Sequence, residues 1–272
     1  MKSDVQTAQA FADSWNHLPK GSVYTREQFE DWMYPIIYKD VQGKTVLELG
    51  CGNASLMVHM AEWKPSYLEG VDLGDSVTTA ELNTAHLEHV SVVRGDLVTY
   101  TASKPFDLVY CIGVLHHLQE PQKGFESVLR NTKPGGAFHC WVYAWEGNAV
   151  VRWVIDPIRR LTSILPWWFT KYCVATPLAA VFFVYAKVIR LCACFRWVHA
   201  CPMYEYAYWI AQRGFDFFQH VAFDQLVTPQ TTYIRRDTIN RWLTSSTNID
   251  QNTVYITKRN GNSWKFGGKV LG

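Results

Sequence analysis

The chain has 272 residues, 18% of them charged, and a formal net charge of +2, so it is long enough for one elaborated domain or a domain with an appendage. The weak net charge and the lack of a basic run give no electrostatic case for a nucleic-acid partner. Seven scattered cysteines without CxxC spacing indicate neither a zinc site nor a disulfide framework. The first residues, MKSDVQTAQAFADSW, carry acids and no apolar segment, so we expect no secretory signal and a cytoplasmic protein.

Taken in chain order, the first element is a helix that begins at the capping box Thr25-Arg26-Glu27-Gln28 and runs to about Tyr38. Strand and helix patterns then alternate. Strands are predicted near 45–49, 67–72, 90–94, 106–111 and 137–143, and helices near 55–63 (capped by Ser55), 76–87 and 121–132. The turn Lys133-Pro134-Gly135-Gly136 separates the last helix from the fifth strand. This alternation predicts an α/β fold with a doubly wound, mostly parallel sheet.

Beyond residue 147 the composition changes. Residues 148–219 are rich in tryptophan, tyrosine and aliphatic side chains at helical spacing, with few acids, which predicts a helical insertion. A helix capped by Asp237 follows and runs to Leu243, and residues 252–258 alternate as a strand at the sheet edge. We therefore divide the chain into an N-terminal helical segment (1–40), an α/β core (41–147), an aromatic helical insertion (148–222) and a return to the core (223–272).

Polar and glycine residues gather at the predicted strand ends, where open α/β sheets bind their ligands. Glu48 precedes the tight turn Gly50–Gly52, whose small residues let the backbone approach a ligand closely. Asp72 ends the second strand, and a carboxylate there can accept hydrogen bonds from both hydroxyls of a ribose. Asp96 follows the third strand and could accept an adenine amino hydrogen. Each acid has a plainer alternative role as the cap of the next helix.

The combination ELGCGNAS, Asp72, Asp96, FDLVYCIGVLHHL and KPGGAFHCW resembles class I S-adenosylmethionine-dependent methyltransferases over roughly residues 40–145. One departure is Ala54, which stands where a third glycine is often seen. The resemblance implies a seven-stranded Rossmann-like methyltransferase sheet with a helical cap. It also implies S-adenosylmethionine as the cofactor, S-adenosylhomocysteine as the product, and no metal.

The family's cofactor contacts carry over to the matching positions of this chain: Tyr24, Glu48, Gly50, Cys51, Gly52, Asn53, Asp72, Leu73, Asp96, Leu97, Ile112 and Gly113. The resemblance gives Glu48 the task of orienting the glycine loop or meeting the cofactor's ammonium group. It also implies that the segment Trp15–Tyr24 closes over the cofactor, with Tyr24 near the cofactor's carboxylate. Packing of Tyr24 against the helix that it precedes is the alternative.

His117 and His116 are the candidate catalytic bases, because a neutral imidazole accepts a proton near pH 7. A cap or a backbone hydrogen bond is the alternative role for either ring. We expect His139, Tyr143, Gln225 and Tyr233 on the substrate side, although His139 also fits a core position. The polar loop 223–233 could equally hold itself together as a turn.

The insertion contains an uncharged run, Tyr172 to Ala186, which at fifteen residues is shorter than the ~20 that a membrane span requires. We expect these helices to form a lid over an apolar substrate. The alternative is an apolar face within 163–195 that lies on anionic lipid, with Arg159, Arg160, Lys171, Lys187 and Arg190 beside it.

The predicted function is methyl transfer from S-adenosylmethionine to a small, apolar or lipid-like acceptor; the sequence identifies neither the acceptor atom nor the oligomeric state. Three alternatives remain. A cyclopropane-synthase-like enzyme would carry an acid where this chain has His116. A dinucleotide-binding domain would carry a glycine at Ser55. A cofactor-binding protein without catalysis would lack a channel for the acceptor.

Overall fold

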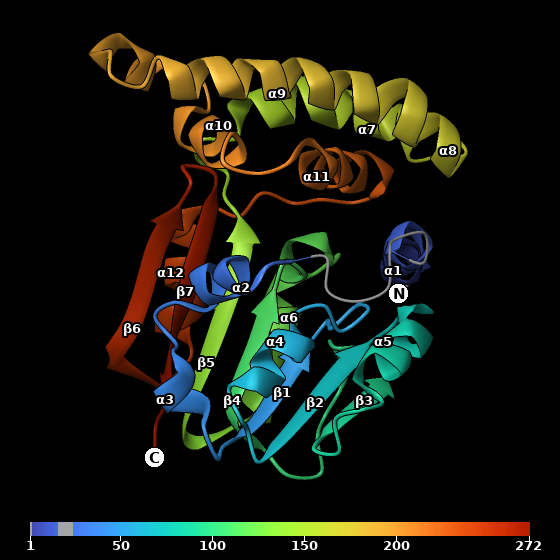
Figure 1. Cartoon of the computed structure of the whole chain (residues 1–272). Helices are drawn as coiled ribbons and strands as arrows, with labels where there is room; N and C mark the ends of the chain where they lie inside the picture. The colour runs from blue at the N-terminus through green and yellow to red at the C-terminus, as the bar shows by residue number, and fades with distance from the viewer. Residues whose placement is uncertain (1, 16–23) are drawn as a thin grey trace. The chain divides into compact units, whose positions relative to one another are not determined.

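The computed structural model describes residues 2–15 and 24–272, and the chain forms two compact units (Figure 1). The sheet unit comprises Met1–Tyr143, Gln230–Thr257 and Trp264–Gly272. The helical unit comprises Ala144–Pro229 and Lys258–Ser263, so it is inserted between two parts of the sheet unit.

The sheet unit is built on seven strands in the order β3-β2-β1-β4-β5-β7-β6. The strands are β1 (Thr45–Leu49), β2 (Tyr67–Asp72), β3 (Val90–Arg94), β4 (Phe106–Ile112), β5 (Thr132–Tyr143), β6 (Ile249–Arg259) and β7 (Ser263–Val270). The first five are parallel, which confirms the doubly wound sheet. Strand β7 runs antiparallel to β5, because Gly267 lies against Phe138 while Gly272 lies near Gly135.

The carboxyl ends of the central strands meet at one edge of the sheet, which positions the candidate site. The aliphatic strand β1 is buried and pairs on one side with β2, where Leu49 lies opposite Val71, and on the other with β4. Strand β4 pairs in turn with β5, where Ile112 lies opposite Trp141. The loops that follow β1, β2 and β4 therefore emerge side by side.

The sheet is flanked by short helices: α1 (Lys2–Trp15), α2 (Arg26–Met33), α3 (Tyr38–Val41), α4 (Met57–Glu62), α5 (Ser76–Thr84), η1 (Leu115–His117), α6 (Pro121–Asn131) and α12 (Arg236–Ser245). The capping box at Thr25 is confirmed, since its hydroxyl accepts from the Gln28 amide and the Gln28 side chain accepts from the Thr25 amide. The prediction that this helix continues to Tyr38 is wrong. It ends at Met33, because Pro35 disfavours helical geometry in the residue before it.

Three further predictions of local structure need correction. Ser55 is not a helix cap; α4 begins after Leu56, and the Ser55 amide and hydroxyl instead donate to the Asn53 side chain. Asp237 lies in the first turn of α12, whose N-cap is Arg235. The predicted turn at 133–136 lies inside β5, as a bulge between the pairs Phe106–Thr132 and Leu108–Ala137.

The helical unit contains η2 (Val151–Ile155), α7 (Asp156–Thr162), α8 (Trp167–Phe169), η3 (Thr170–Ala175), α9 (Thr176–Leu191), η4 (Arg196–Ala200), α10 (Tyr204–Ile210) and α11 (Phe215–Val227). Its main core is formed where small residues of α9, including Ala179 and Ala186, meet Ala207 and Phe218 of α10 and α11. The hairpin turn 258–263 belongs to this unit, since Asn148 donates to the Asn262 carbonyl at 2.6 Å.

We predict that Gly267→Ala destabilises the sheet unit by roughly 2–4 kcal/mol, because the added Cβ would lie 2.4 Å from the Phe138 carbonyl oxygen of β5. Gly214→Ala is the control, since its Cβ would meet no atom within 4 Å, and it should change stability by less than about 1 kcal/mol. Urea unfolding followed by circular dichroism measures both. Equal midpoints for the two variants would contradict the packing described here.

Candidate cofactor and acceptor site

The loop after β1 requires glycine for both conformation and space. Gly50 and Gly52 have φ angles of 84° and 54°, in the left-handed region. A Cβ on Gly50 would lie 2.5 Å from Val114 Cγ2. The amides of Gly50 and Cys51 both donate to the Val71 carbonyl, at 2.7 and 3.1 Å, which anchors the loop against the end of β2.

Asp72 connects the loop after β1 to the loop after β2. Its Oδ2 accepts from the Gly52 amide at 2.9 Å, and its Oδ1 accepts from the Gly74 amide at 2.9 Å and from the Ser76 hydroxyl at 3.2 Å. The carboxylate is half-buried at the carboxyl end of β2, and Leu73 follows it in the same loop. Asp72 and Leu73, which are both predicted to contact the cofactor, therefore lie beside the glycine loop.

Glu48 is a buried carboxyl group directly beneath this loop. Its side chain is 1% exposed and accepts a 2.7 Å hydrogen bond from the Tyr110 hydroxyl of β4. Burial raises the pKa of Glu48 to about 8; the Tyr110 hydrogen bond opposes this rise and the nearby Asp72 carboxylate adds to it. The site thus holds a carboxyl group that a bound cation would stabilise as a carboxylate.

Hydrogen bonds and packing within the loop after β1 fix its shape. The Asn53 side chain accepts from the Ser55 amide and hydroxyl, while its carbonyl accepts from the Asn83 side chain at 2.9 Å. Cys51 is buried, and burial raises the pKa of its thiol, so it packs as a small apolar side chain. Ala54, at the position where a third glycine is often seen, has a φ of 66°, in the left-handed region that favours glycine.

The loop after β3 carries Asp96 and Leu97. Oδ1 of Asp96 accepts from the Val98 amide at 2.9 Å, and its carbonyl accepts from the Tyr100 amide at 2.8 Å, so the segment is a compact turn. Leu97 is buried. The structure therefore presents a half-buried carboxylate next to an apolar side chain, the pair predicted for an adenine.

At the end of β4, Ile112 is buried and Gly113 turns the chain with a φ of 80°. The Gly113 amide donates to the Trp141 carbonyl at 3.1 Å, and a Cβ on Gly113 would lie 3.6 Å from the Trp141 ring. Trp141 is itself buried, and its indole Nε1 has no hydrogen-bond partner within the described part of the chain. A buried donor of this kind favours a bound acceptor atom.

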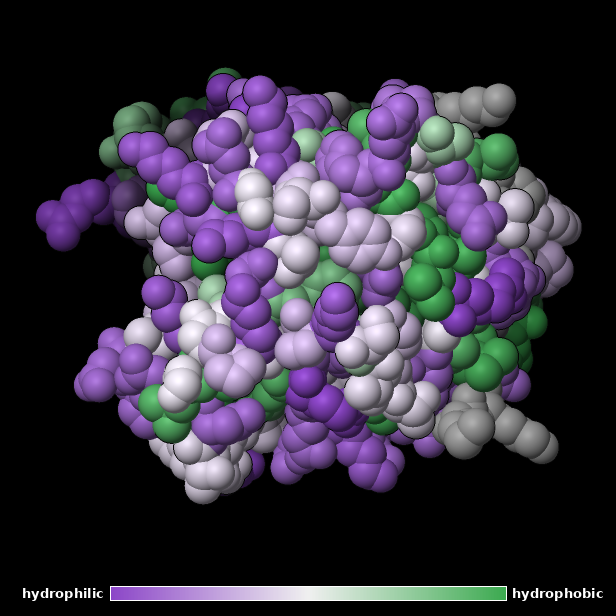
Figure 2. Space-filling view, turned by 90° about the horizontal axis from the view of Figure 1, so that it is seen from below, coloured by the Kyte–Doolittle hydropathy of each residue, from purple (hydrophilic) through white to green (hydrophobic). Residues whose placement is uncertain are grey.

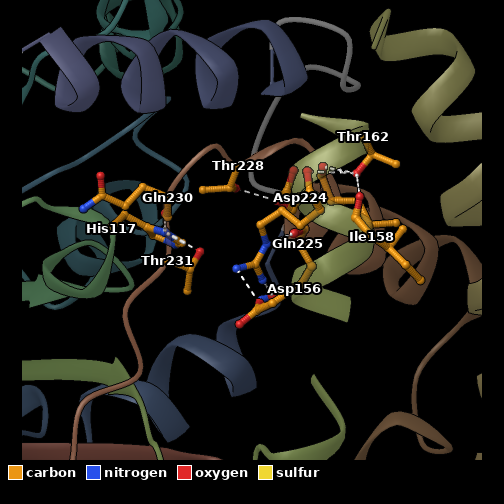
Figure 3. A network of polar contacts seen from close by, with 11 residues as sticks. His117, Asp156, Ile158, Thr162, Asp224, Gln225, Thr228, Gln230 and Thr231 are labelled. Atoms are coloured by element: carbon orange, nitrogen blue, oxygen red, sulfur yellow. Dashed lines mark hydrogen bonds and ion pairs between the residues drawn. The ribbon is translucent and has the colours of Figure 1, made fainter. Parts of the chain in front are cut away.

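The two histidines of η1 have different hydrogen bonds. His116 is fully buried, and its Nδ1 accepts from the Tyr143 amide at 3.4 Å. His117 Nδ1 lies 2.9 Å from the Gln230 carbonyl and 3.2 Å from the Thr231 hydroxyl (Figure 3). A carbonyl only accepts, so neutral His117 carries its proton on Nδ1 and its lone pair on Nε2.

Aromatic rings surround this histidine pair. Phe11 of α1 meets His117 edge-on with ring centroids 4.9 Å apart, and Tyr143 lies 4.2 Å from the His116 ring. The rings of Trp141 and Tyr233 both lie near the ring of Tyr143, with centroid distances of 5.2 and 6.3 Å. We call Phe11, Trp141, Tyr143 and Tyr233 the aromatic cluster; it gives the end of β4 an apolar wall.

Two residues predicted on the substrate side make other contacts. His139 is fully buried, with Nε2 2.7 Å from the Trp32 carbonyl and Nδ1 2.6 Å from the Tyr255 hydroxyl. Burial also lowers the pKa of His139 to about 4, so it is a neutral core residue. Gln225 lies on α11 of the helical unit, where Arg159 donates to its carbonyl and its side chain (Figure 3). The contacts of His139 place it in the core, and the substrate role of Gln225 stays a prediction.

Tyr24 packs edge-on against Trp32 at 4.8 Å, and its carbonyl lies 2.8 Å from His59 Nε2. The expected closing segment Trp15–Tyr24 falls largely on residues 16–23, which lie outside the described residues. Helix α1 is instead the N-terminal element in contact with the site. Asp4 accepts from the Gln119 amide at 2.9 Å, and the Ala8 carbonyl lies where a Cβ of Gly74 would approach to 3.0 Å.

The sequence analysis placed residues 1–40 in an N-terminal helical segment but did not predict α1 as a helix of its own. Val5, Ala8, Phe11 and Ala12 recur at helical spacing, which is the signal that could have found it. Metal ligation has no candidate among residues 2–15 and 24–272, where no group of three histidine, cysteine or acidic side chains comes together.

Comparison with known proteins agrees with this geometry. Residues 47–138 match the methyltransferase domain family. An uncharacterized protein of Synechococcus sp. is 27% identical over 143 residues, which cover 48% of this chain and 34% of that protein. A ubiquinone biosynthesis O-methyltransferase of Neisseria meningitidis serogroup C is 30% identical over 105 residues, covering 36% of this chain and 44% of the enzyme. The matches thus span less than half the length of these relatives.

Magnesium protoporphyrin IX methyltransferase from Synechocystis PCC 6803, solved with bound S-adenosylhomocysteine, shares the fold over 91% of this chain and 83% of its own, with a TM-score of 0.53 and 12% identity. The shared fold agrees with the match to the family model. Residues 47–138 thus form a methyltransferase domain of the class I S-adenosylmethionine-dependent kind, and S-adenosylmethionine is its cofactor.

Proposed function

We propose that the protein transfers a methyl group from S-adenosylmethionine to a hydroxyl group of an apolar, lipid-like acceptor, with His117 as the general base. The observation that carries this proposal is the position of His117: it lies at the end of β4, with a fixed tautomer, among the aromatic cluster. An O-methyltransferase among the similar proteins supports an oxygen acceptor.

The residues present fit this cofactor. The glycine loop has no room for a Cβ at Gly50, Asp72 and Asp96 offer acceptor oxygens at adjacent strand ends, and Glu48 offers a buried carboxyl group. Asp72 would hold the ribose hydroxyls, Asp96 and Leu97 the adenine, and Glu48 the ammonium group. When bound, the sulfonium supplies an electrophilic methyl group.

The protein's own task is to position and deprotonate the acceptor. The Gln230 carbonyl holds the His117 ring in the tautomer whose Nε2 lone pair accepts a proton. His116 is less suited to this role, because its Nδ1 lone pair already accepts from the Tyr143 amide and its proton is on Nε2. We therefore assign the base to His117 and a positioning role to His116.

The aromatic cluster favours an apolar acceptor. Trp141 and Tyr233 are almost fully buried, and their rings contact Tyr143, which in turn contacts both histidines. Aromatic walls of this kind bind flat or hydrocarbon groups and exclude water from the methyl-transfer site. A charged, strongly hydrated acceptor would lose its solvation here without a partner.

The direct test of the acceptor class is incubation of the protein with labelled S-adenosylmethionine and either a short-chain isoprenoid hydroquinone or free catechol. We expect label in the organic phase, in a product that resists mild alkali, as a methyl ether does. Absence of a labelled ether of the hydroquinone would contradict the hydroxyl acceptor, and equal turnover of catechol would contradict the lipid-like class.

Asp72→Ala should weaken S-adenosylhomocysteine binding about 100-fold, since two charge-assisted hydrogen bonds to the ribose are lost. Isothermal titration calorimetry measures the dissociation constant. The matched control is Asp75→Ala, three residues further on, where an exposed carboxylate pairs with Arg94. Because Asp72 also connects two loops, thermal unfolding of the variant must first show a folded protein. Unchanged affinity in a folded variant would remove Asp72 from the cofactor site.

His117→Asn should lower kcat with the hydroquinone about 100- to 1,000-fold while S-adenosylhomocysteine affinity stays within about threefold. The wild-type kcat/KM should fall at low pH as the base is protonated, and the variant should lack this dependence. His116→Asn is the comparison and should retain the low-pH limb. A variant of His117 that keeps both the rate and the pH profile would show that no base acts there.

Glu48 should make the cofactor-free protein less stable as pH rises. Its pKa is about 8 in the folded state and about 4.5 when unfolded, so folding binds a proton between these values. The contribution of Glu48 to the free energy of unfolding is therefore fully present below about pH 4.5 and is lost as pH rises through 8. Glu48→Gln should remove this dependence, which amounts to at most about 5 kcal/mol. Urea unfolding across this pH range measures it, with exposed Glu62→Gln as the variant expected to retain the wild-type slope.

A further inference from the structure

The exposed apolar surface of the protein is concentrated on the helical unit. Of the large hydrophobic side chains that are exposed among the described residues, eighteen of twenty-four belong to this unit. By contrast, the surface shown in Figure 2 is mostly hydrophilic, with hydrophobic residues in small separate patches. Such a concentration of exposed apolar side chains on one unit indicates an interaction site.

Helix α9 exposes a row of aliphatic side chains to solvent. Val181, Val184, Val188 and Leu191 are 73%, 63%, 51% and 81% exposed, and their spacing of three, four and three residues places them on one face. The opposite face, with Ala179, Ala186 and Ile189, is packed against α10 and α11. The exposed row is therefore a second apolar face of the helix, and the core of the helical unit does not cover it.

Aromatic side chains are exposed around both ends of this helix. Trp167, Trp168 and Tyr172 precede α9, and Phe195 and Trp197 follow it, with the last two rings stacked at 6.3 Å. Tryptophan and tyrosine are enriched where a protein meets the headgroup level of a bilayer. We call these residues and the exposed residues of α9 the apolar face.

The charge of this region matches an anionic surface. Residues 157–204 contain six lysines and arginines and no aspartate or glutamate. Arg160 and Arg196 are exposed, whereas Arg159 is buried and paired with Asp156, and Lys187 and Arg190 both donate to the Ala211 carbonyl. Each exposed cation near an anionic lipid surface strengthens binding, and the missing acids remove the opposing repulsion.

The structure also bears on whether this helix crosses the membrane. The continuous helical stretch Trp167–Leu191 is long and apolar enough to do so, and only 22% of its apolar window is buried. It extends well beyond the fifteen-residue run that the sequence suggested. Yet its inner side carries polar contacts, since Lys187 donates to the Ala211 carbonyl and Gln219 donates to Thr176. A spanning helix would place these groups, with α10 and α11, in hydrocarbon.

We propose that the apolar face docks flat on an anionic lipid bilayer, with the valines of α9 in the acyl region and the exposed cations at the phosphates. The proposal rests on the helical unit alone and is independent of the acceptor. A protein docked in this way reaches molecules dissolved in the membrane without an integral anchor.

The test is flotation of the purified full chain with vesicles of phosphatidylcholine, alone or mixed with phosphatidylglycerol. We expect binding to the mixed vesicles, weakened by salt. Val181→Asp should lower the partition coefficient by about tenfold or more. Leu82→Asp is the matched control, since Leu82 is 72% exposed on α5 of the sheet unit, and it should bind as wild type. Both variants should retain S-adenosylhomocysteine binding, which separates this test from that of the methyltransferase function.

Three results would overturn the proposal. Equal binding to neutral and mixed vesicles would exclude the charge-assisted mode, and protein that stays in the membrane after alkaline carbonate would indicate a spanning helix. A lipid-free dimer that Val181→Asp converts to a monomer, with no vesicle binding, would assign the apolar face to a second copy of the chain. Sedimentation velocity measures the last of these.

Discussion

The site depends on the Asp72 carboxylate. Its two oxygens accept from the amides of Gly52 and Gly74, so one side chain holds together the loops that follow β1 and β2. Hydrogen bonds to a carboxylate are stronger than those between neutral groups, and here they add to the bonds from Gly50 and Cys51 to the Val71 carbonyl. The parallel pairing of β1 with β2 and β4 brings the strand ends together, and Asp72 then connects the loops that follow them.

The part of the site that would bind the acceptor is held by hydrogen bonds from a distant segment of the chain. Here the His117 ring is oriented by the backbone of a segment more than a hundred residues away, through the Gln230 carbonyl. The Thr232 amide donates to the His116 carbonyl at 2.7 Å, and the Ile234 amide donates to the Tyr143 carbonyl at 2.9 Å. The histidines are thus held by main-chain contacts, which tolerate change in the side chains that line the acceptor side.

Much of the cofactor half was predictable from sequence, whereas the acceptor half was not. Strands β1, β2 and β3 begin and end where predicted, because buried parallel strands are continuous aliphatic runs bounded by turns. The partners of Glu48 and the role of Gln230 depend on contacts between distant segments, which no local pattern encodes. The same limit explains His139, whose position on β5 suggested the acceptor site although its ring faces Trp32 and Tyr255. Composition revealed the aromatic insertion, but only burial showed which of its residues face solvent.

The connection of Tyr143 to Ile234 has a consequence for how such enzymes diversify. Tyr143 is the last residue of β5, and the chain enters the helical unit at Ala144 and returns to the sheet unit at Gln230. The hydrogen bond between Tyr143 and Ile234 therefore closes the insertion at its base, within the sheet unit. An insertion closed in this way can be exchanged between homologues together with the hairpin turn 258–263 that packs on it, without altering the register of any cofactor-binding strand. The membrane contact that we propose for the helical unit can then change by recombination while the cofactor-binding strands are inherited intact.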